Sequence, residues 1–422
     1  MKKILKIIFL MLFVLGSMIS IPSLSAFEWG FLMNQTLGVD GVAGGADNQD
    51  TKLSYSGALL PWFSIPLGSP GNPAGKLYFS AGVTALYPNN NSDMPVFFVP
   101  ELLRTELAFR IGANSELKFG RMNYSDPLGL VVHGLFDGAR FTFSLKNSTF
   151  STGVWYTGFQ YKKTANITMT ESDSLSFHQA FDYAKFTDTY FAPRRLIAAL
   201  DWNNPYAASW LRLKISLIGQ YDFTRDDSYY HSQYLVIKAG IPAGNFNFDI
   251  GGCFELAEIP DELKISFAGD LGIGWVLPTP IRDKLQLTFR LTNGAIPDSP
   301  IAAFGPITTI SQGDILQAKF SGLSMLRLDY TARLHDTFSF NIASSYFIAS
   351  DYVTYEGYPQ VSSGERDGYF LGNEFYGRLI WSPLSDLQFN LGGGIFLPSM
   401  GNTGSQSGAL WRINLNVTLA IF

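Results

Sequence analysis

Polar and apolar residues alternate along most of the chain. The clearest case is 284–292, Lys-Leu-Gln-Leu-Thr-Phe-Arg-Leu-Thr, in which every second residue is apolar. Successive side chains of a β-strand point to opposite faces of a sheet, so this pattern predicts a strand with one apolar and one polar face. Segments of this kind recur about 18 times between Phe27 and Phe422, with 16 as the alternative count. The sequence therefore predicts an all-β protein.

The joins between these segments alternate in length. Joins after even-numbered segments are mostly tight turns, such as Gly112–Ser115 and His335–Asp336. The long joins follow odd-numbered segments: Gly38–Asp50, Met122–Asp137, Lys162–Arg194, Asn293–Gln317, Asp351–Tyr369 and Pro398–Gly408. Short turns on one side and long loops on the other are typical of transmembrane antiparallel β-barrels, whose turns are periplasmic and whose loops are outside. A soluble β-sandwich is the alternative, but so many long strands in series exceed an ordinary sheet.

The first 26 residues have the pattern of an export signal. Lys2, Lys3 and Lys6 precede an unbroken apolar run, Ile7–Leu15, and small residues follow up to Ala26. This order predicts a signal peptide, residues 1–26, cleaved near Ala26. An uncleaved anchor is the alternative, but the apolar run is short for a full span. We expect residues 27–422 to form one barrel domain.

Composition agrees with an exported barrel. Aromatic and charged residues each make up 15% of the chain, which also contains 41 Gly and 21 Pro. Beyond the signal no apolar run is long enough for a membrane helix, and a closed barrel is the other structure that satisfies its backbone hydrogen bonds in lipid. The net charge of −5 argues against nucleic acid as a partner, and a single Cys excludes a disulfide framework.

The last segment carries a resemblance. Residues 411–422, Trp-Arg-Ile-Asn-Leu-Asn-Val-Thr-Leu-Ala-Ile-Phe, alternate and end on an aromatic residue. This resembles the closing strand of bacterial outer-membrane β-barrel proteins of the porin type. The resemblance implies an outer-membrane location, contact with membrane lipid, and recognition of Phe422 by the barrel assembly machinery. The apolar positions alternate out of phase with Phe422, which leaves the direction of that side chain open.

A barrel of 16 to 18 strands leaves an aqueous channel. The polar, inward phase of the strands contains more basic than acidic residues, although the chain is acidic as a whole. The candidate pore-lining residues are Arg104, Arg110, Lys118, Arg140, Arg212, Lys214, Lys264, Lys284, Arg290, Arg327, Arg333 and Arg378, and Arg195, Lys238 and Arg412 belong to the same phase. A basic wall predicts a weakly anion-preferring channel for passive diffusion of small hydrophilic solutes. The alternative is that these charges pair between neighbouring strands and only stiffen the wall.

The third predicted outer loop, Met122–Asp137, is unusually apolar for an exposed loop. In porins, which the chain resembles, the third outer loop folds into the barrel and narrows it. The resemblance implies the same use here, with Asp126, His133 and Asp137 as candidate constriction residues. The alternative is that this loop packs on the rim or contacts a neighbouring subunit of a homo-oligomer.

Other functions have less support in the sequence. Four His residues are scattered without metal-ligand spacing, so we predict neither an enzyme nor a metal or other cofactor. Two alternatives to the porin remain. The long loops Lys162–Arg194 and Asn293–Gln317 could make the chain a surface adhesin or interaction barrel, or the apolar third loop could serve a transporter of hydrophobic substrates.

Overall fold

The computed structural model describes residues 27–43, 51–69, 72–87, 96–223, 229–260, 262–351, 369–398 and 408–422. The predicted signal peptide, 1–26, lies outside this part of the chain, as do segments of the predicted loops Gly38–Asp50, Asp351–Tyr369 and Pro398–Gly408.

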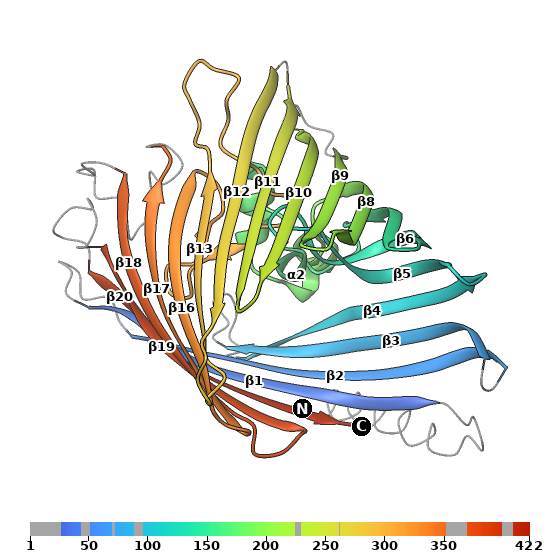
Figure 1. Cartoon of the computed structure of the whole chain (residues 1–422), viewed down its shortest axis with the longest axis horizontal. Helices are drawn as coiled ribbons and strands as arrows, with labels where there is room; N and C mark the ends of the chain where they lie inside the picture. Colours follow the sequence, from blue (N-terminus) through green and yellow to red (C-terminus); the bar gives the residue numbers. More distant parts are fainter. Residues whose placement is uncertain are drawn as a thin grey trace.

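Eighteen strands form one closed antiparallel sheet (Figure 1). Each strand pairs with the next along the chain, and the last strand pairs with the first, from Phe31 opposite Ile421 to Ala43 opposite Ala409. The predicted barrel of about 18 strands is confirmed. Its strands are β1 (Glu28–Ala43), β2 (Lys52–Ser69), β3 (Asn72–Tyr87), β4 (Phe97–Ile111), β5 (Ser115–Ser125), β6 (His133–Leu145), β7 (Ser148–Tyr156), β8 (Arg195–Ala208), β9 (Leu211–Asp222), β10 (His231–Ala243), β11 (Phe246–Ile259), β12 (Glu262–Val276), β13 (Lys284–Thr292), β16 (Leu323–His335), β17 (Phe338–Ala349), β18 (Phe370–Trp381), β19 (Leu387–Leu397) and β20 (Ala409–Ile421).

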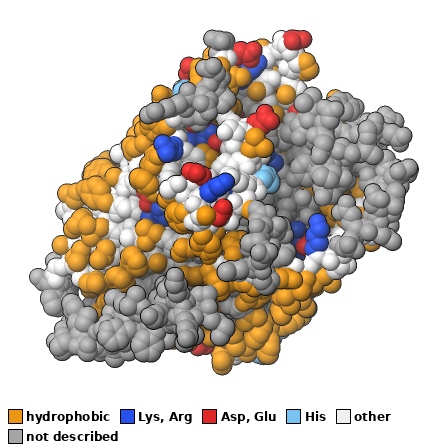
Figure 2. Space-filling model, turned by 180° about the vertical axis from the view of Figure 1, so that it is seen from behind, with side chains coloured by type: hydrophobic (Ala, Val, Ile, Leu, Met, Phe, Trp, Pro, Cys, Tyr) orange, Lys and Arg blue, Asp and Glu red, His pale blue; other side chains and the backbone are white. Residues whose placement is uncertain are grey.

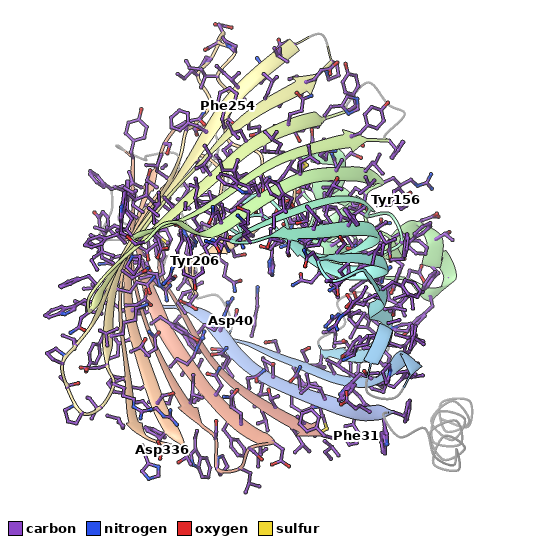
Figure 3. The ribbon with its side chains drawn as sticks, turned by 45° about the vertical axis from the view of Figure 1, so that its right-hand side comes forward. Phe31, Asp40, Tyr156, Tyr206, Phe254 and Asp336 are labelled. Atoms are coloured by element: carbon purple, nitrogen blue, oxygen red, sulfur yellow. The ribbon has the colours of Figure 1, made fainter. Side chains whose placement is uncertain are left out.

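The two faces of the wall differ as the alternation predicts. Large apolar side chains of the outward phase, such as Leu217 and Phe254, are exposed because nothing in the protein covers them. Side chains project from both faces of the sheet (Figure 3), and hydrophobic side chains form broad patches on the surface seen in Figure 2. An apolar outer belt around a closed barrel is the arrangement that a lipid bilayer requires.

In the last strand, the apolar residues alternate out of phase with Phe422 up to the end of the strand at Ile421. In β20, Ile413 and Leu415 are in the outward phase, while Asn416 faces inward and donates to Thr36 Oγ1 of β1 at 2.8 Å. Phe422 follows the strand and is 84% exposed, with its ring 6.1 Å from that of Trp62.

Short elements occur within two outer loops. Between β7 and β8 lie α2 (Lys162–Ala165), α3 (Glu171–His178), η1 (Tyr183–Lys185) and α4 (Phe186–Tyr190); between β13 and β16 lie β14 (Ser311–Gln312) and β15 (Ala318–Lys319). None of the helices in the described ranges has the length and apolar character needed to cross a bilayer.

The third outer loop is shorter than predicted. Strand β5 runs to Ser125 and β6 begins at His133, so the loop comprises 126–132 rather than Met122–Asp137. The strands continue because Met122, Tyr124 and Phe136 keep the period of two and are buried against an apolar inner wall.

Candidate channel lining and constriction

Three outer loops fold back against the inside of the barrel. We name them the third loop (126–132), the helical insert (157–194) and the inner loop (293–322). They pack mainly on the outer halves of β5–β12, where the inward-facing residues are apolar, and the end of the inner loop packs on β16–β19. Wall residues of this shared core include Trp155, Ile197, Val236 and Cys253; loop residues include Leu130, Val131, Val132, Phe304 and Phe320. Burial of these apolar faces holds the loops inside.

Asp126 holds the third loop in shape. Its buried carboxylate accepts hydrogen bonds from the backbone N–H groups of Leu128, Gly129, Val131 and Val132, at 2.8 to 3.0 Å. Each oxygen of this carboxylate therefore accepts two hydrogen bonds from the loop backbone. Asp126 is a structural residue of the loop and does not line an opening.

The other two constriction candidates have different surroundings. His133 is exposed, and its backbone N–H donates to Thr308 Oγ1 at 2.9 Å. Asp137 forms a two-pronged ion pair with Arg121 of β5, at 2.7 and 2.9 Å. Lys118 and Arg140 are paired across β5 and β6 and face inward. Arg121 and Asp137 are paired three positions further along, and successive residues of a strand point to opposite faces, so Asp137 points away from the lumen. The three candidates are not brought together.

The three loops are bonded to one another through two threonines. Thr308 N–H donates to Val131 O of the third loop at 3.2 Å, and Thr309 N–H donates to Asn166 O of the insert at 2.8 Å. Lys319 Nζ donates to Thr168 O at 2.7 Å. The inner loop is thus the central member of the set, and displacement of one loop would strain the others.

Buried wall carboxylates fix the inner loop to the sheet. Glu255 of β11 accepts from Gly305 N–H at 2.8 Å and from the Tyr230 and Tyr234 hydroxyls at 2.8 and 3.1 Å. Glu374 of β18 accepts from the backbone N–H groups of Asp314, Ile315 and Leu316, at 2.8 to 2.9 Å. These carboxylates serve loop docking, since their acceptor sites are occupied by protein donors.

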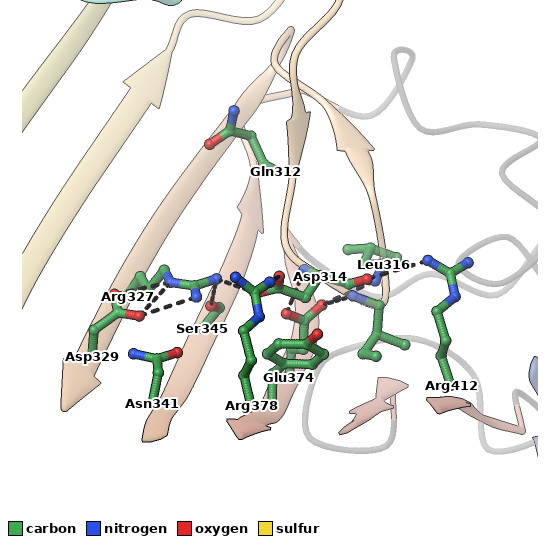
Figure 4. A network of polar contacts seen from close by, with 12 residues as sticks. Gln312, Asp314, Leu316, Arg327, Asp329, Asn341, Ser345, Glu374, Arg378 and Arg412 are labelled. Atoms are coloured by element: carbon green, nitrogen blue, oxygen red, sulfur yellow. Dashed lines mark hydrogen bonds and ion pairs between the residues drawn. The ribbon is translucent and has the colours of Figure 1, made fainter. Parts of the chain in front are cut away.

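Docking of the inner loop places Asp314 among wall arginines (Figure 4). Arg327 lies 2.8 Å from Asp314 and 2.9 Å from Asp329, and Arg378 lies 3.5 Å from Asp314. Arg412 donates to Asp314 O at 3.3 Å. Beside this network a polar cavity of about 420 Å³ opens along the inner wall. Its lining includes Lys284, Gln286, Thr288, Arg290, Gln312, Thr331 and Asn341.

Most of the predicted pore-lining residues have acidic partners. The ion pairs are Arg104–Glu106, Lys118–Glu116 (3.2 Å), Arg140–Asp201 (3.6 Å), Lys264–Glu262, Arg290–Asp270 (2.9 Å), Arg333–Asp336 (3.3 Å) and those of Arg327 and Arg378. Of these pairs, Arg290–Asp270 joins neighbouring strands, whereas most of the others lie within one strand or turn or join the wall to Asp314 of the inner loop. Arg333 lies at a periplasmic turn, half exposed.

A smaller basic set has no ion pair within the described ranges: Arg110, Arg212, Lys214, Lys238 and Lys284. Lys214 of β9 lies directly opposite Lys238 of β10, and Arg212 lies opposite Gly240 on the same face. That face is the inward one, because it also contains Ile218 and Val236 of the loop-covered core. Asp249 of β11, which lies opposite Gly240, accepts a hydrogen bond from Asn247 at 2.6 Å.

Solved structures with a similar fold include an outer membrane protein and a porin. A BenF-like porin from Pseudomonas fluorescens Pf-5 is 8% identical, with a TM-score of 0.62, over 94% of this chain and 99% of that one. The outer membrane protein OpdK from Pseudomonas aeruginosa is 10% identical, with a TM-score of 0.61 and the same coverage. OccAB1 from Acinetobacter baumannii is 10% identical over 94% of this chain and 97% of that one, with a TM-score of 0.60. The chain has the fold of the outer-membrane porins.

At these identities the likeness establishes the porin fold alone. No family model matches the chain, and no curated protein matches its sequence. The porin fold and the apolar belt agree with the predicted location in the bacterial outer membrane. Among the residues that the structure describes, no group of three His, Cys, Asp or Glu residues is placed to hold a metal ion.

Proposed function

We propose that the protein is an outer-membrane channel for passive diffusion of small hydrophilic solutes, with a weak preference for anions. The closed barrel with a polar inner cavity supports a water-filled route, and the porin fold agrees with it. The three in-folded loops narrow that route, so size selection follows from them. The proposal includes export by the signal peptide, 1–26, and assembly through the C-terminal strand; an oligomeric state stays a prediction.

The observation that carries the anion preference is the unpaired basic set on β9 and β10. Like charges directly opposite on neighbouring strands are destabilising. Lys214 and Lys238 are such a pair, and neither of them forms an ion pair within the described ranges. A mobile anion in the lumen compensates them instead, and a low-dielectric wall focuses their field into the channel.

An adhesin or interaction barrel is less well supported by the same geometry. The helical insert and the inner loop were the candidate partner-binding loops, but both are docked on the inner wall through buried contacts.

Planar-bilayer recording tests the proposed function. The wild-type protein should give discrete conductance steps and a reversal potential of the anion-selective sign in a KCl gradient. The double variant K214Q/K238Q should move that potential toward zero. The matched control K146Q/R282Q removes two positive charges from exposed periplasmic turns and should leave the potential unchanged. Cation selectivity of the wild type contradicts the anion preference, and absence of conductance contradicts the channel.

A further inference from the structure

The wall is not closed by backbone hydrogen bonds along the whole of one seam. Strand β4 pairs with β5 only from Thr105 to Ile111. Above Thr105, β4 continues on β3 to Phe97, while β5 continues on β6 to Ser125. The two strands diverge from their common turn in Figure 1. Facing edges without a ladder are costly in a membrane, because lipid supplies no hydrogen bonds.

Gly120 lies where β5 leaves β4. Its φ of +107° is in the region that favours glycine, and a Cβ there would lie 2.2 Å from Thr105 O. The backbone of β5 therefore lies too close to Thr105 for a side chain at this residue, and its pairing with β4 ends at the next residue, Arg121.

Side chains replace the missing ladder. The Tyr183 hydroxyl of the helical insert donates to Phe98 O and accepts from Phe98 N–H at 3.2 Å. The Tyr190 hydroxyl donates to Pro100 O at 2.6 Å, and Pro100 has no N–H that would need a partner at this edge. Arg121 Nη1 donates to Leu102 O. The insert therefore takes the place of a strand, and its bonds to β4 are made by side chains.

Apolar groups line this seam from the inside of the wall to the outside. On the lumen side, Val99 is buried with Tyr161 and Tyr190 of the insert, whose ring centroids are 5.0 Å apart. On the lipid side, Phe98 of β4 and Phe159 of the insert are exposed, Phe159 by 63%. The insert and β4 can move apart without breaking a β-ladder, because side chains form this seal. The apolar groups of the seal would also contact the apolar tail of a molecule that passes through it.

We propose that the β4–β5 seam is a lateral exit, through which amphiphiles with an apolar tail pass between the lumen and the surrounding lipid when the helical insert moves. The exit serves a class of solute different from the small hydrophilic solutes of the channel. The insert is the moving part, since its bonds to β4 are made by side chains whereas the strands on either side stay paired to β3 and β6.

The test bridges the insert to β4. In a Cys253→Ala background, Val99→Cys and Tyr190→Cys are joined by a short, reducible bis-methanethiosulfonate reagent. Bacterial cells that produce each variant are supplied with dansyl-undecanoic acid, and purified protein is recorded in planar bilayers. The matched control, F109C/L117C, bridges two directly opposed lipid-facing positions in the paired part of the same seam. Migration of unheated protein on denaturing gels verifies that each barrel is folded.

The wild type should raise probe uptake above that of cells without the protein. The V99C/Y190C bridge should abolish this gain, keep the ionic conductance and be reversed by a reductant, while the control bridge changes neither. Y183F/Y190F, which removes two of the seam hydroxyls, should raise uptake without altering ion selectivity. No gain of uptake by the wild type, or uptake that persists with the insert bridged, overturns the lateral exit. Uptake without ionic conductance would instead refute the proposed channel.

Discussion

At the scale of single residues, buried carboxylates organise the inside of this barrel. Asp126, Glu255 and Glu374 each accept several hydrogen bonds, and most of the donors are backbone N–H groups of in-folded loops. Backbone N–H groups turned toward a wall need acceptors, and a carboxylate satisfies several at once. Acidic residues of the lumen therefore fix loops, which leaves part of the basic set unpaired.

Asp126→Asn should loosen the third loop. An amide offers one acceptor oxygen where the carboxylate offers two, so at least one pair of the four N–H groups loses its partner. Each buried unpaired donor costs about 1–3 kcal/mol. We expect a lower unfolding temperature, measured by heat-dependent gel migration in detergent. The control, Asp298→Asn, changes an exposed loop carboxylate and should have little effect. Equal stability of D126N and wild type would show that the loop does not depend on these bonds.

Lys162 predicts a pH dependence of the helical insert. Burial lowers the pKa of its amine to about 8, and Nζ has no hydrogen-bond partner within the described ranges. Between about pH 8 and the ordinary pKa of a lysine, Lys162 binds more protons in the unfolded insert than in the folded one. The free energy of unfolding of the insert therefore rises with pH across this window. Subtilisin cleavage within 157–194 should slow between about pH 7 and pH 10.

The variant Lys162→Met removes the buried amine and should make cleavage several-fold slower at neutral pH, with little further change as the pH rises. Lys146→Met, in an exposed turn, is the control. Identical pH profiles for K162M and wild type would exclude this amine as the cause.

At the scale of elements, the residues between β14 and β15 are held to the inner wall by Glu374. Glu374→Gln removes an acceptor from the N–H groups that hold residues 314–316 to the wall. We expect the segment to detach, the conductance to rise, and the anion preference to increase because Asp314 leaves Arg327 and Arg378. Single-channel recording measures both quantities, with Asp298→Asn in an exposed part of the same inner loop as control. A lower conductance in E374Q would contradict this role.

The strands could be predicted from sequence, whereas the loops could not. A period of two appears wherever one face meets lipid, so the number and order of strands follow from alternation. Alternation of polar and apolar residues cannot show where a strand ends when both of its faces are apolar. This is the case at Met122 and Phe136, because these inward-facing residues pack under a loop and do not border water. The docking of Asp314 and the Arg121–Asp137 pair depend on the path of distant segments, for which the sequence has no local signal.

At the scale of the whole molecule, the barrel wall is divided by function. The outer halves of β5–β12 form a dry surface under the in-folded loops, and the seam between β4 and β5 is sealed by one of them. The inner faces of β13, β16 and β17 border the polar cavity, and three of the five unpaired basic residues lie on β9 and β10. On the proposed function, ion selectivity depends on these few unpaired charges rather than on the total charge of the inner wall.

This arrangement predicts a selectivity that weakens as salt rises. The Debye length falls from about 10 Å at 0.1 M to about 3 Å at 1 M ionic strength, so the field of Lys214 and Lys238 reaches less of the lumen at high salt. The ratio of chloride to potassium permeability, measured from reversal potentials at a fixed KCl ratio, should approach the bulk value as both concentrations are raised. The control variant R290Q/D270N removes both charges of one ion pair and leaves the net charge unchanged. Its permeability ratio should depend on salt as that of the wild type does, because two opposite charges 2.9 Å apart contribute little field beyond their own vicinity. K214Q/K238Q should be nearly independent of salt. A wild-type ratio that stays constant over the same range would show that pore size, and not the unpaired lysines, sets the preference.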